Sequence, residues 1–333
     1  MKACSGRSAK PIHDNLCLFL GILKGNLNTK ESILKVLVYF DIFRYPLTRK
    51  EIESFLDQPF PEEKLNESFK ELLSSGRIFQ LCEFYSLRND ISLVEIRKKG
   101  NANADTLIKK AKEIAKLLYK FPYVRAIGLS GSVSKNFADE NSDIDYFLIT
   151  KANRLWIART LLVFFRKNPF LKNRHKYYCM NYFVDEADLD IKEKNIYTAT
   201  ELFTLIPLAG NGSLKKFFEK NSWSHSYFPN RALPIIKEEI NFKDPWFKKL
   251  IEFLLNNRFG NWLDNYLFKI TTARWQKKEE RKKLNVKGER MGIKTDKHFS
   301  KPNPIFFHNS FIETYKKRLK EIEEKKMVSY IHN

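Results

Sequence analysis

The sequence predicts an α+β protein in which helices surround a small β-sheet. Three short apolar runs in the middle of the chain, at residues 126–129, 146–149 and 177–184, are typical of buried strands. Amphipathic stretches with apolar residues at helical spacing lie before and after these runs. The length of 333 residues agrees with two or three domains and leaves ample room for a core.

We divide the chain into four parts. Residues 1–28 form a leader that contains the apolar run 16–23, which we interpret as a short helix rather than a signal peptide because no small-residue cleavage site follows. Residues 29–90 form a first domain, 91–210 a second domain that contains the three apolar runs, and 211–333 a basic, helical region. No stretch reaches the roughly 18 apolar residues that span a membrane, so we expect a soluble protein.

The composition restricts the partners and the compartment. The formal net charge is +21, and residues 201–333 carry 27 basic side chains against 15 acidic ones. A basic surface attracts nucleoside triphosphates, nucleic acids and anionic membranes, although a merely solvated lysine-rich surface explains the charge equally well. The four cysteines lie far apart, which excludes a zinc site or a disulfide framework and favours the reducing cytoplasm.

The first domain is predicted to contain three helices and a hairpin. The helices cover 29–44, 49–56 and 62–74, the first two capped by Thr29 and Thr48, and residues 78–81 and 84–87 are predicted to form a two-stranded wing. This arrangement resembles a winged helix domain. In the third helix, acidic residues outnumber basic ones, and carboxylates repel DNA phosphates. We therefore prefer a scaffolding or protein-contact role for this domain, with DNA binding as the weaker alternative.

The region 126–150 contains the residues best suited to chemistry. An apolar strand ends in Ser130-Gly131-Ser132, ten residues follow, and Asp143-Ile144-Asp145 opens a second apolar strand. Aspartates two residues apart on a strand point to the same side, and a fold tolerates this pair most readily when a hard cation lies between the carboxylates. The Gly-Ser turn offers backbone N–H groups and a hydroxyl to phosphate. Together these residues predict a site for a metal and a triphosphate.

This pattern resembles the nucleotidyltransferase superfamily related to DNA polymerase β, which includes the antibiotic nucleotidyltransferases. The resemblance covers about residues 121–184 and implies a mixed β-sheet core. It implies that Gly131 and Ser132 hold the phosphates of a nucleotide such as ATP, with Lys135 as a helper. It also implies that Asp143 and Asp145 bind two Mg²⁺ ions as the catalytic carboxylates.

The third strand, 177–184, departs from the pattern of that superfamily. Related enzymes place a third carboxylate on this strand, whereas this chain has Asn181 there, followed by Asp185, Asp188 and Asp190 at or beyond the strand end. An amide oxygen can coordinate a metal but cannot accept a proton. We expect Asn181 to be a metal ligand, and we expect the role of the base to pass to Asp185 or to the environment of the substrate itself.

The remaining elements are predicted to be helical. A helix over 105–119 ends before Pro122, and a helix over 154–165 carries Arg154 and Arg159, which either reach a triphosphate or are ordinary surface charges. A helix over 195–209 brings Thr198, Thr200 and Glu201 to the acceptor pocket or simply begins with common helix-start residues. One or two helices over 245–275 supply apolar side chains for packing on the sheet. They are followed by a basic segment over 269–290 and a last helix over 309–327.

Two functions agree with these features. The first is a Mg²⁺-dependent nucleotidyltransferase that transfers a nucleoside monophosphate to an unidentified acceptor, which could be a small molecule, a protein or an RNA end. The second is a non-catalytic protein of the same fold that contacts DNA or a protein partner. The chain lacks the P-loop and the Gly-x-Gly-x-x-Gly patterns, which disfavours a P-loop enzyme and a dinucleotide-binding protein.

Overall fold

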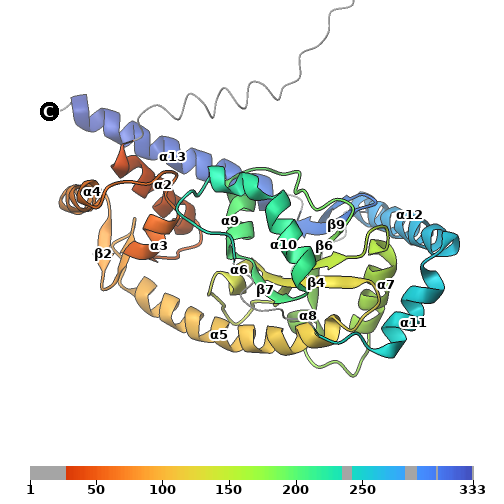
Figure 1. Ribbon diagram of the computed structural model, residues 1–333. Helices are drawn as coiled ribbons and strands as arrows, with labels where there is room; N and C mark the ends of the chain where they lie inside the picture. The colour runs from red at the N-terminus through yellow and green to blue at the C-terminus, as the bar shows by residue number, and fades with distance from the viewer. Residues whose placement is uncertain (1–27, 235–241, 282–290, 305–306, 332–333) are drawn as a thin grey trace, which may run out of the picture.

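A six-stranded β-sheet lies between two layers of helices in the computed structural model, which describes residues 28–234, 242–281, 291–304 and 307–331 (Figure 1). The strand order is β7-β4-β5-β6-β9-β8. β5 and β6 are parallel and the other neighbours are antiparallel, so the sheet is mixed and the fold is α+β. The strands are β4 (Val124–Ser130), β5 (Asp145–Thr150), β6 (Cys179–Asp185), β7 (Ile206–Ala209), β8 (Met291–Thr295) and β9 (Phe299–Pro304).

Alternating side chains of the strands build two cores, one on each face of the sheet. On one face, Tyr146 and Leu148 pack in a core that includes residues of α5 (Ser92–Leu118) and α7 (Leu155–Arg166). On the other face, Phe147 and Ile149 pack against α9 (Ile196–Thr204) and α10 (Asn211–Lys220). The central strands are therefore apolar on both sides, which explains why β5 appears in the sequence as a continuous apolar run.

The predicted elements of the first domain are all present. They are α2 (Thr29–Asp41), β1 (Leu47–Thr48), α3 (Arg49–Ser54), α4 (Glu62–Ser74), β2 (Phe79–Leu81) and β3 (Phe84–Ser86). Thr48 caps α3 through a capping box with Glu51, as expected, whereas Asn28 and not Thr29 caps α2. β1 adds a third strand to the hairpin, in the order β1-β3-β2. Whether this domain acts as a winged helix stays a prediction.

The first domain shares a core with distant parts of the chain. Phe203 of α9 and Phe311 of α13 (Phe307–Ile331) belong to the same buried cluster as the apolar face of α2. The ring of Tyr39 lies 5.0 Å from that of Phe311, and α13 runs along the N-terminal helices (Figure 1). The N-terminal and C-terminal segments therefore pack on one another.

Three strands of the sheet were not anticipated from the sequence. The helix predicted over 195–209 ends at Thr204, and residues 206–209 form β7 on the edge of β4. Strands β8 and β9 follow later in the chain, and Phe299 and Ser300 pair with Val184 and Phe183 of β6. The C-terminal region therefore contributes strands as well as helices.

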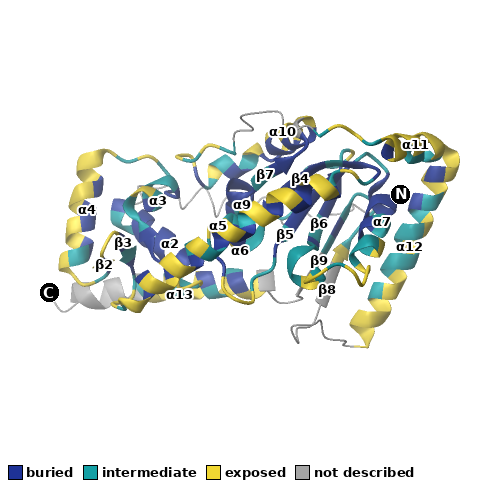
Figure 2. Cartoon of the chain, turned by 90° about the horizontal axis from the view of Figure 1, so that it is seen from below, coloured by how far each residue is buried: buried dark blue, intermediate teal, exposed yellow. Residues whose placement is uncertain are grey.

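The apolar residues over 245–275 divide into two groups. Leu263, Leu267, Phe268 and Trp275 pack against the cores beside the sheet, as predicted. Most of the apolar residues over 246–255 face solvent instead, which corrects the prediction for that part. α11 (Trp246–Leu255) and α12 (Arg258–Glu280) lie at the edge of the molecule, and α11 is mainly exposed (Figure 2). Trp246 and Phe253 are 75% and 80% exposed. Short helices α6 (Gly131–Ser134), α8 (Arg174–Tyr177) and η1 (Ser222–Ser226) complete the fold.

Some predictions concern residues outside the described ranges. The leader 1–27 and the part of the basic segment over 282–290 are among these residues. Among the residues that the structure describes, no helix combines the length and the apolar character that crossing a bilayer requires.

Candidate functional site

The candidate site lies where three strands of the central sheet have their ends. The register places Ser130, the last residue of β4, opposite Asp145, the first residue of β5, and Asp145 opposite Cys179, the first residue of β6. The Ser130 hydroxyl donates a hydrogen bond to the Asp145 carbonyl over 3.3 Å. The turn after β4 and the aspartates before β5 therefore meet at one edge of the sheet.

The two aspartates lie on the same side of the chain. Ile144 between them is completely buried, whereas Asp143 and Asp145 are both partly exposed. The Ile144 N–H donates to the Lys176 carbonyl over 2.8 Å, which holds this segment beside α8. β5 itself begins at Asp145, so Asp143 is positioned by this contact rather than by the sheet.

Gly131 allows the turn after β4 to approach the Asp145 carboxylate closely. Its φ of +75° lies in the left-handed region, and a Cβ atom at this position would be 2.4 Å from Asp145 Oδ2. Any other residue would therefore both strain the backbone and push the carboxylate away. Ser132 is exposed beside it, and the buried Val133 anchors the turn in the core.

Asn181 contacts the Asp145 carboxylate. Its Nδ2 donates to Asp145 Oδ1 over 2.5 Å, and the Cys179 thiol donates to Asn181 Oδ1 over 3.1 Å. The register of β6 shifts between its pairings to Tyr146 and Phe147, and Asn181 is the extra residue at this irregularity. An amide that rotates by half a turn would present its oxygen instead of its nitrogen to a cation beside Asp145.

The Cys179 thiol shows the electrostatic character of the site. Burial, together with the negative charges of Asp145 and Asp143, raises its pKa to about 12. Both carboxylates therefore act on one partly buried thiol, which stays protonated and unreactive at neutral pH.

Lys135 is held by Glu201 at the base of the turn. Its Nζ lies 2.6 Å from Glu201 Oε1 and donates to the Gly131 carbonyl over 3.0 Å. Tyr197, one turn earlier on α9, is partly buried, and the charges of Glu201 and Asp145 add to the effect of burial in raising its pKa. Glu201 therefore belongs to the surroundings of the turn. The sequence marked it only as a helix-start residue or a lining of the acceptor pocket.

Asp185 lies at the wrong end of β6 for the expected role, which corrects its assignment as the base. The register pairs it with Thr150, the last residue of β5, whereas Asp145 is the first. At about 3.3 Å per residue, five residues separate the two positions by roughly 17 Å. The carboxylate of Asp185 is completely buried and accepts from the N–H groups of Asn153 and Ala187 over 2.8 and 2.9 Å.

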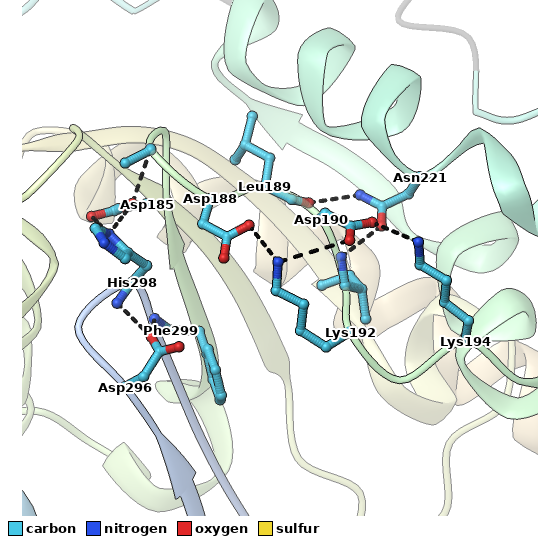
Figure 3. A network of polar contacts seen from close by, with 12 residues as sticks. Asp185, Asp188, Leu189, Asp190, Lys192, Lys194, Asn221, Asp296, His298 and Phe299 are labelled. Atoms are coloured by element: carbon cyan, nitrogen blue, oxygen red, sulfur yellow. Dashed lines mark hydrogen bonds and ion pairs between the residues drawn. The ribbon is translucent and has the colours of Figure 1, made fainter. Parts of the chain in front are cut away.

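Figure 3 shows what these acids do instead. Asp185 lies beside His298, with 3.0 Å between Asp185 Oδ2 and His298 Nδ1, and so ties β6 to the turn before β9. Asp188 and Asp190 form ion pairs with Lys192 and Lys194 in the following loop. These contacts are structural and lie away from Asp143 and Asp145.

The two arginines of the helix after β5 also face elsewhere. Arg154 is buried and donates to the Leu255 carbonyl over 3.1 Å and to Asn261 Oδ1 over 2.5 Å. Arg159 is buried with its guanidinium 4.2 Å from the ring centre of Trp275. Both arginines hold α12 in place from the interior, so they are neither triphosphate ligands nor ordinary surface charges. Thr200 is likewise buried and bonds to the Ile196 carbonyl of its own helix.

The oxygen atoms at this edge suit a hard cation. Among the described residues, no three His, Cys, Asp or Glu side chains gather closely enough to hold a metal ion. The available ligands are therefore the carboxylates of Asp143 and Asp145 and the amide oxygen of Asn181, and phosphate oxygens would have to complete the shell. Mg²⁺ is commonly bound in this way, through one or two carboxylates and substrate phosphates.

Comparison with known proteins supports the same assignment. Residues 108–205 match the family model described as the nucleotidyltransferase domain. This segment begins in α5, ends just after α9, and includes Gly131, Asp143, Asp145 and Asn181. Searches of the curated proteins and of the solved structures returned no match. The match supports the nucleotidyltransferase superfamily for this segment and, with it, nucleotidyl transfer as the general activity.

Proposed function

We propose that the protein is a Mg²⁺-dependent nucleotidyltransferase that transfers a nucleoside monophosphate from a nucleoside triphosphate to an acceptor hydroxyl or a similar nucleophile. The observation that carries this proposal is the contact between the Gly131 turn and the Asp145 carboxylate, which the backbone of Gly131 alone permits. Because of this contact, the N–H groups of the Gly131 turn, which would bind phosphate, lie next to the Asp145 oxygens, which would bind the metal. The triphosphate substrate agrees with the cytoplasmic location expected from the cysteines.

The residues of the chain have separate tasks in this reaction. Gly131 and Ser132 bind the β- and γ-phosphates through N–H groups and a hydroxyl, and Lys135 adds positive charge from below the turn. Asp143 and Asp145 orient the triphosphate through the cation that they hold. When bound, Mg²⁺ supplies charge neutralisation at the α-phosphate and at the leaving pyrophosphate. Positioning and charge account for most of the rate in such transfers.

The proton of the acceptor needs a route that does not depend on Asn181. An amide cannot accept a proton, and Asp185 lies at the other end of β6. The proton therefore passes to one of the two aspartates or to water as the acceptor oxygen attacks the α-phosphorus and pyrophosphate leaves.

A transfer assay tests this function. The purified chain is incubated with Mg²⁺, α-labelled nucleoside triphosphates and candidate acceptors, and pyrophosphate release is measured. Asp145→Asn should lower the rate by at least about a hundredfold, the typical effect of removing one group that stabilises the transition state. Asn181→Asp should leave or raise the rate because it adds a carboxylate. Equal rates for the wild type and Asp145→Asn would refute the assignment.

One observation favours a second function, a non-catalytic binding protein that retains the fold. The third strand places an amide where the superfamily has a carboxylate, and the nearest acid, Asp185, is engaged by His298. This protein would bind nucleotide or a partner without turnover. Its DNA-binding version is the weaker one because the acidic residues of α4 are exposed. Salt-sensitive DNA binding that is unchanged in the double variant Asp143→Ala with Asp145→Ala would support the DNA-binding version. Absence of DNA binding at low salt would contradict that version.

A further inference from the structure

Two consecutive helices at the edge of the molecule expose an unusual number of large apolar side chains. Eight of the fourteen exposed large hydrophobic residues of the described chain belong to α11 and α12. We call them the aromatic surface: Trp246, Phe247, Leu250, Phe253, Leu254, Phe259, Trp262 and Tyr266. Single exposed apolar residues are ordinary, whereas a group of this size marks an interaction site.

The orientation of α11 makes this exposure a built feature of the fold. Lys248 is only 1% exposed, and its Nζ donates to the carbonyls of Tyr119 and Val124, over 3.0 Å each. Glu252, one turn later, accepts from both terminal nitrogens of Arg125 over 3.0 and 2.6 Å. The helix thus turns Lys248 and Glu252 toward the protein body, and its aromatic side chains point outward.

The aromatic surface continues onto α12. The rings of Phe259 and Trp262 lie 5.6 Å apart and those of Trp262 and Tyr266 lie 5.3 Å apart, both stacked. The opposite side of α12 is fixed because Asp264 accepts from the Ile157 N–H over 2.9 Å. The outward face is therefore held in place from behind on both helices.

The segment that carries this surface is rich in exposed cationic side chains. Over 242–281, eight basic residues are exposed (Lys243, Lys249, Arg258, Lys269, Arg274, Lys277, Lys278 and Arg281) against three exposed acids (Asp244, Glu279 and Glu280). Trp, Phe and Leu on one helix face with Lys and Arg around it are typical of helices that lie in the interface of an anionic membrane.

We propose that the aromatic surface of α11 and α12 docks the protein on an anionic lipid surface. The aromatic and leucine side chains would enter the headgroup boundary, where Trp and Tyr are favoured, while the surrounding cations meet lipid phosphates and carboxylates. A second copy of the chain fits less well. A two-fold contact would bring the same eight cations of both copies together, and lysine is depleted from protein interfaces.

The test is vesicle flotation with the full chain. Phosphatidylcholine vesicles with phosphatidylserine should bind the protein, and vesicles of phosphatidylcholine alone should bind it much more weakly. The combined variant Trp246→Ser, Phe253→Ser and Trp262→Ser should lower the affinity for anionic vesicles by at least about tenfold, since it removes three large apolar groups. The emission of exposed Trp246 and Trp262 should also shift to the blue with anionic vesicles only.

The matched control removes equally exposed apolar groups elsewhere. Ile91 and Phe170 are exposed and lie outside α11 and α12, so Ile91→Ser with Phe170→Ser should bind vesicles like the wild type. Three results with vesicles or in solution would overturn the proposal, and a fourth concerns nucleic acid. The first three are absence of binding to anionic vesicles at low salt, unchanged binding of the triple variant, and a wild-type dimer that the triple variant converts to monomer. Binding of single-stranded nucleic acid in place of vesicles, lost in the triple variant, would also overturn it.

Discussion

At the scale of single residues, Gly131 is the position where the backbone and the candidate chemistry depend most directly on one another. Two separate constraints require glycine at this position, the left-handed φ and the closeness to Asp145 Oδ2. Other glycines of the chain serve as controls for these constraints. Gly76 has a φ of +64° with nothing within 4 Å of an added Cβ, and Gly212 has neither the positive φ nor a close neighbour.

We therefore expect three different outcomes from the same substitution. Gly131→Ala should destabilise the protein and abolish metal-dependent nucleotide binding. Gly76→Ala should cost only the strain of the left-handed conformation, about 1–2 kcal/mol, and leave nucleotide binding intact. Gly212→Ala should change neither. Urea unfolding and nucleotide titration measure the two effects, and a Gly131→Ala variant that binds nucleotide normally would contradict the proposed role of the turn.

Asp264 gives a prediction about pH. Burial raises its pKa from 3.8 to about 6, although the hydrogen bond from the Ile157 N–H opposes this rise. Its Oδ2 has no hydrogen-bond partner among the described residues. Because the folded state holds the proton more tightly than the unfolded state, the contribution of Asp264 to stability is complete below about pH 4 and is lost as the pH rises through about 6.

Asp264→Asn should remove this loss. The side-chain oxygen of the asparagine can still accept from the Ile157 N–H. At pH 8 the free energy of unfolding of the variant, measured in urea, should therefore exceed that of the wild type by on the order of 1–3 kcal/mol. The two proteins should become similar near pH 4. Glu280→Gln, at the exposed end of the same helix, serves as a control that should change nothing. A variant less stable than the wild type at pH 8 would contradict the protonation argument.

At the scale of elements, α11 depends on polar anchors rather than on an apolar face. Lys248→Met preserves much of the side-chain volume but removes the Lys248 donor from the Tyr119 carbonyl and from the Val124 carbonyl, which keeps only the longer hydrogen bond from Arg125. We expect a loss of about 2–3 kcal/mol in the free energy of unfolding, the usual cost of unsatisfied buried groups. The exposed neighbour Lys249→Met should have no such effect. Urea unfolding of the two variants compares them, and equal midpoints would show that the anchors are dispensable.

The same helix shows the limit of what periodicity predicts. Apolar spacing over 245–255 indicated a helix, and a helix is present. Periodicity cannot distinguish an inner face from an outer face when buried charges find partners elsewhere in the chain. Here Glu252 finds Arg125, which is 127 residues away. The direction of α11 was therefore predicted wrongly although the element itself was predicted correctly.

The strands of the sheet also differ in how well the local sequence predicts them. β4 and β5 are apolar on both sides, so their patterns predicted them from local sequence alone. β9, with the sequence FSKPNP, has no apolar alternation and forms because β6 offers an edge for pairing. Long-range pairing of this kind also placed Asp185 opposite Thr150, which no local pattern could show.

At the scale of the whole molecule, the candidate site connects parts of the chain that are distant in sequence. The Tyr45 hydroxyl of the first domain donates to the Lys135 carbonyl over 3.2 Å, and Lys135 in turn pairs with Glu201 of α9. α9 shares a core with α2 and α13. Strand and turn patterns in the sequence predicted that Gly131, Asp143 and Asp145 lie in one site. They could not place Glu201, because its position depends on how α9 packs with α2 and α13.

The central claim is that Asp143 and Asp145 bind a nucleoside triphosphate together with Mg²⁺. The chain contains a second Asp-x-Asp pair, Asp188 and Asp190, whose carboxylates form ion pairs with Lys192 and Lys194. Calorimetric titration of ATP and the other nucleoside triphosphates, with and without Mg²⁺, should show metal-dependent binding to the wild type and to Asp188→Asn with Asp190→Asn. Asp143→Asn with Asp145→Asn should weaken that binding by at least about tenfold, or ~1.4 kcal/mol. Unchanged metal-dependent binding by this last variant would contradict the account.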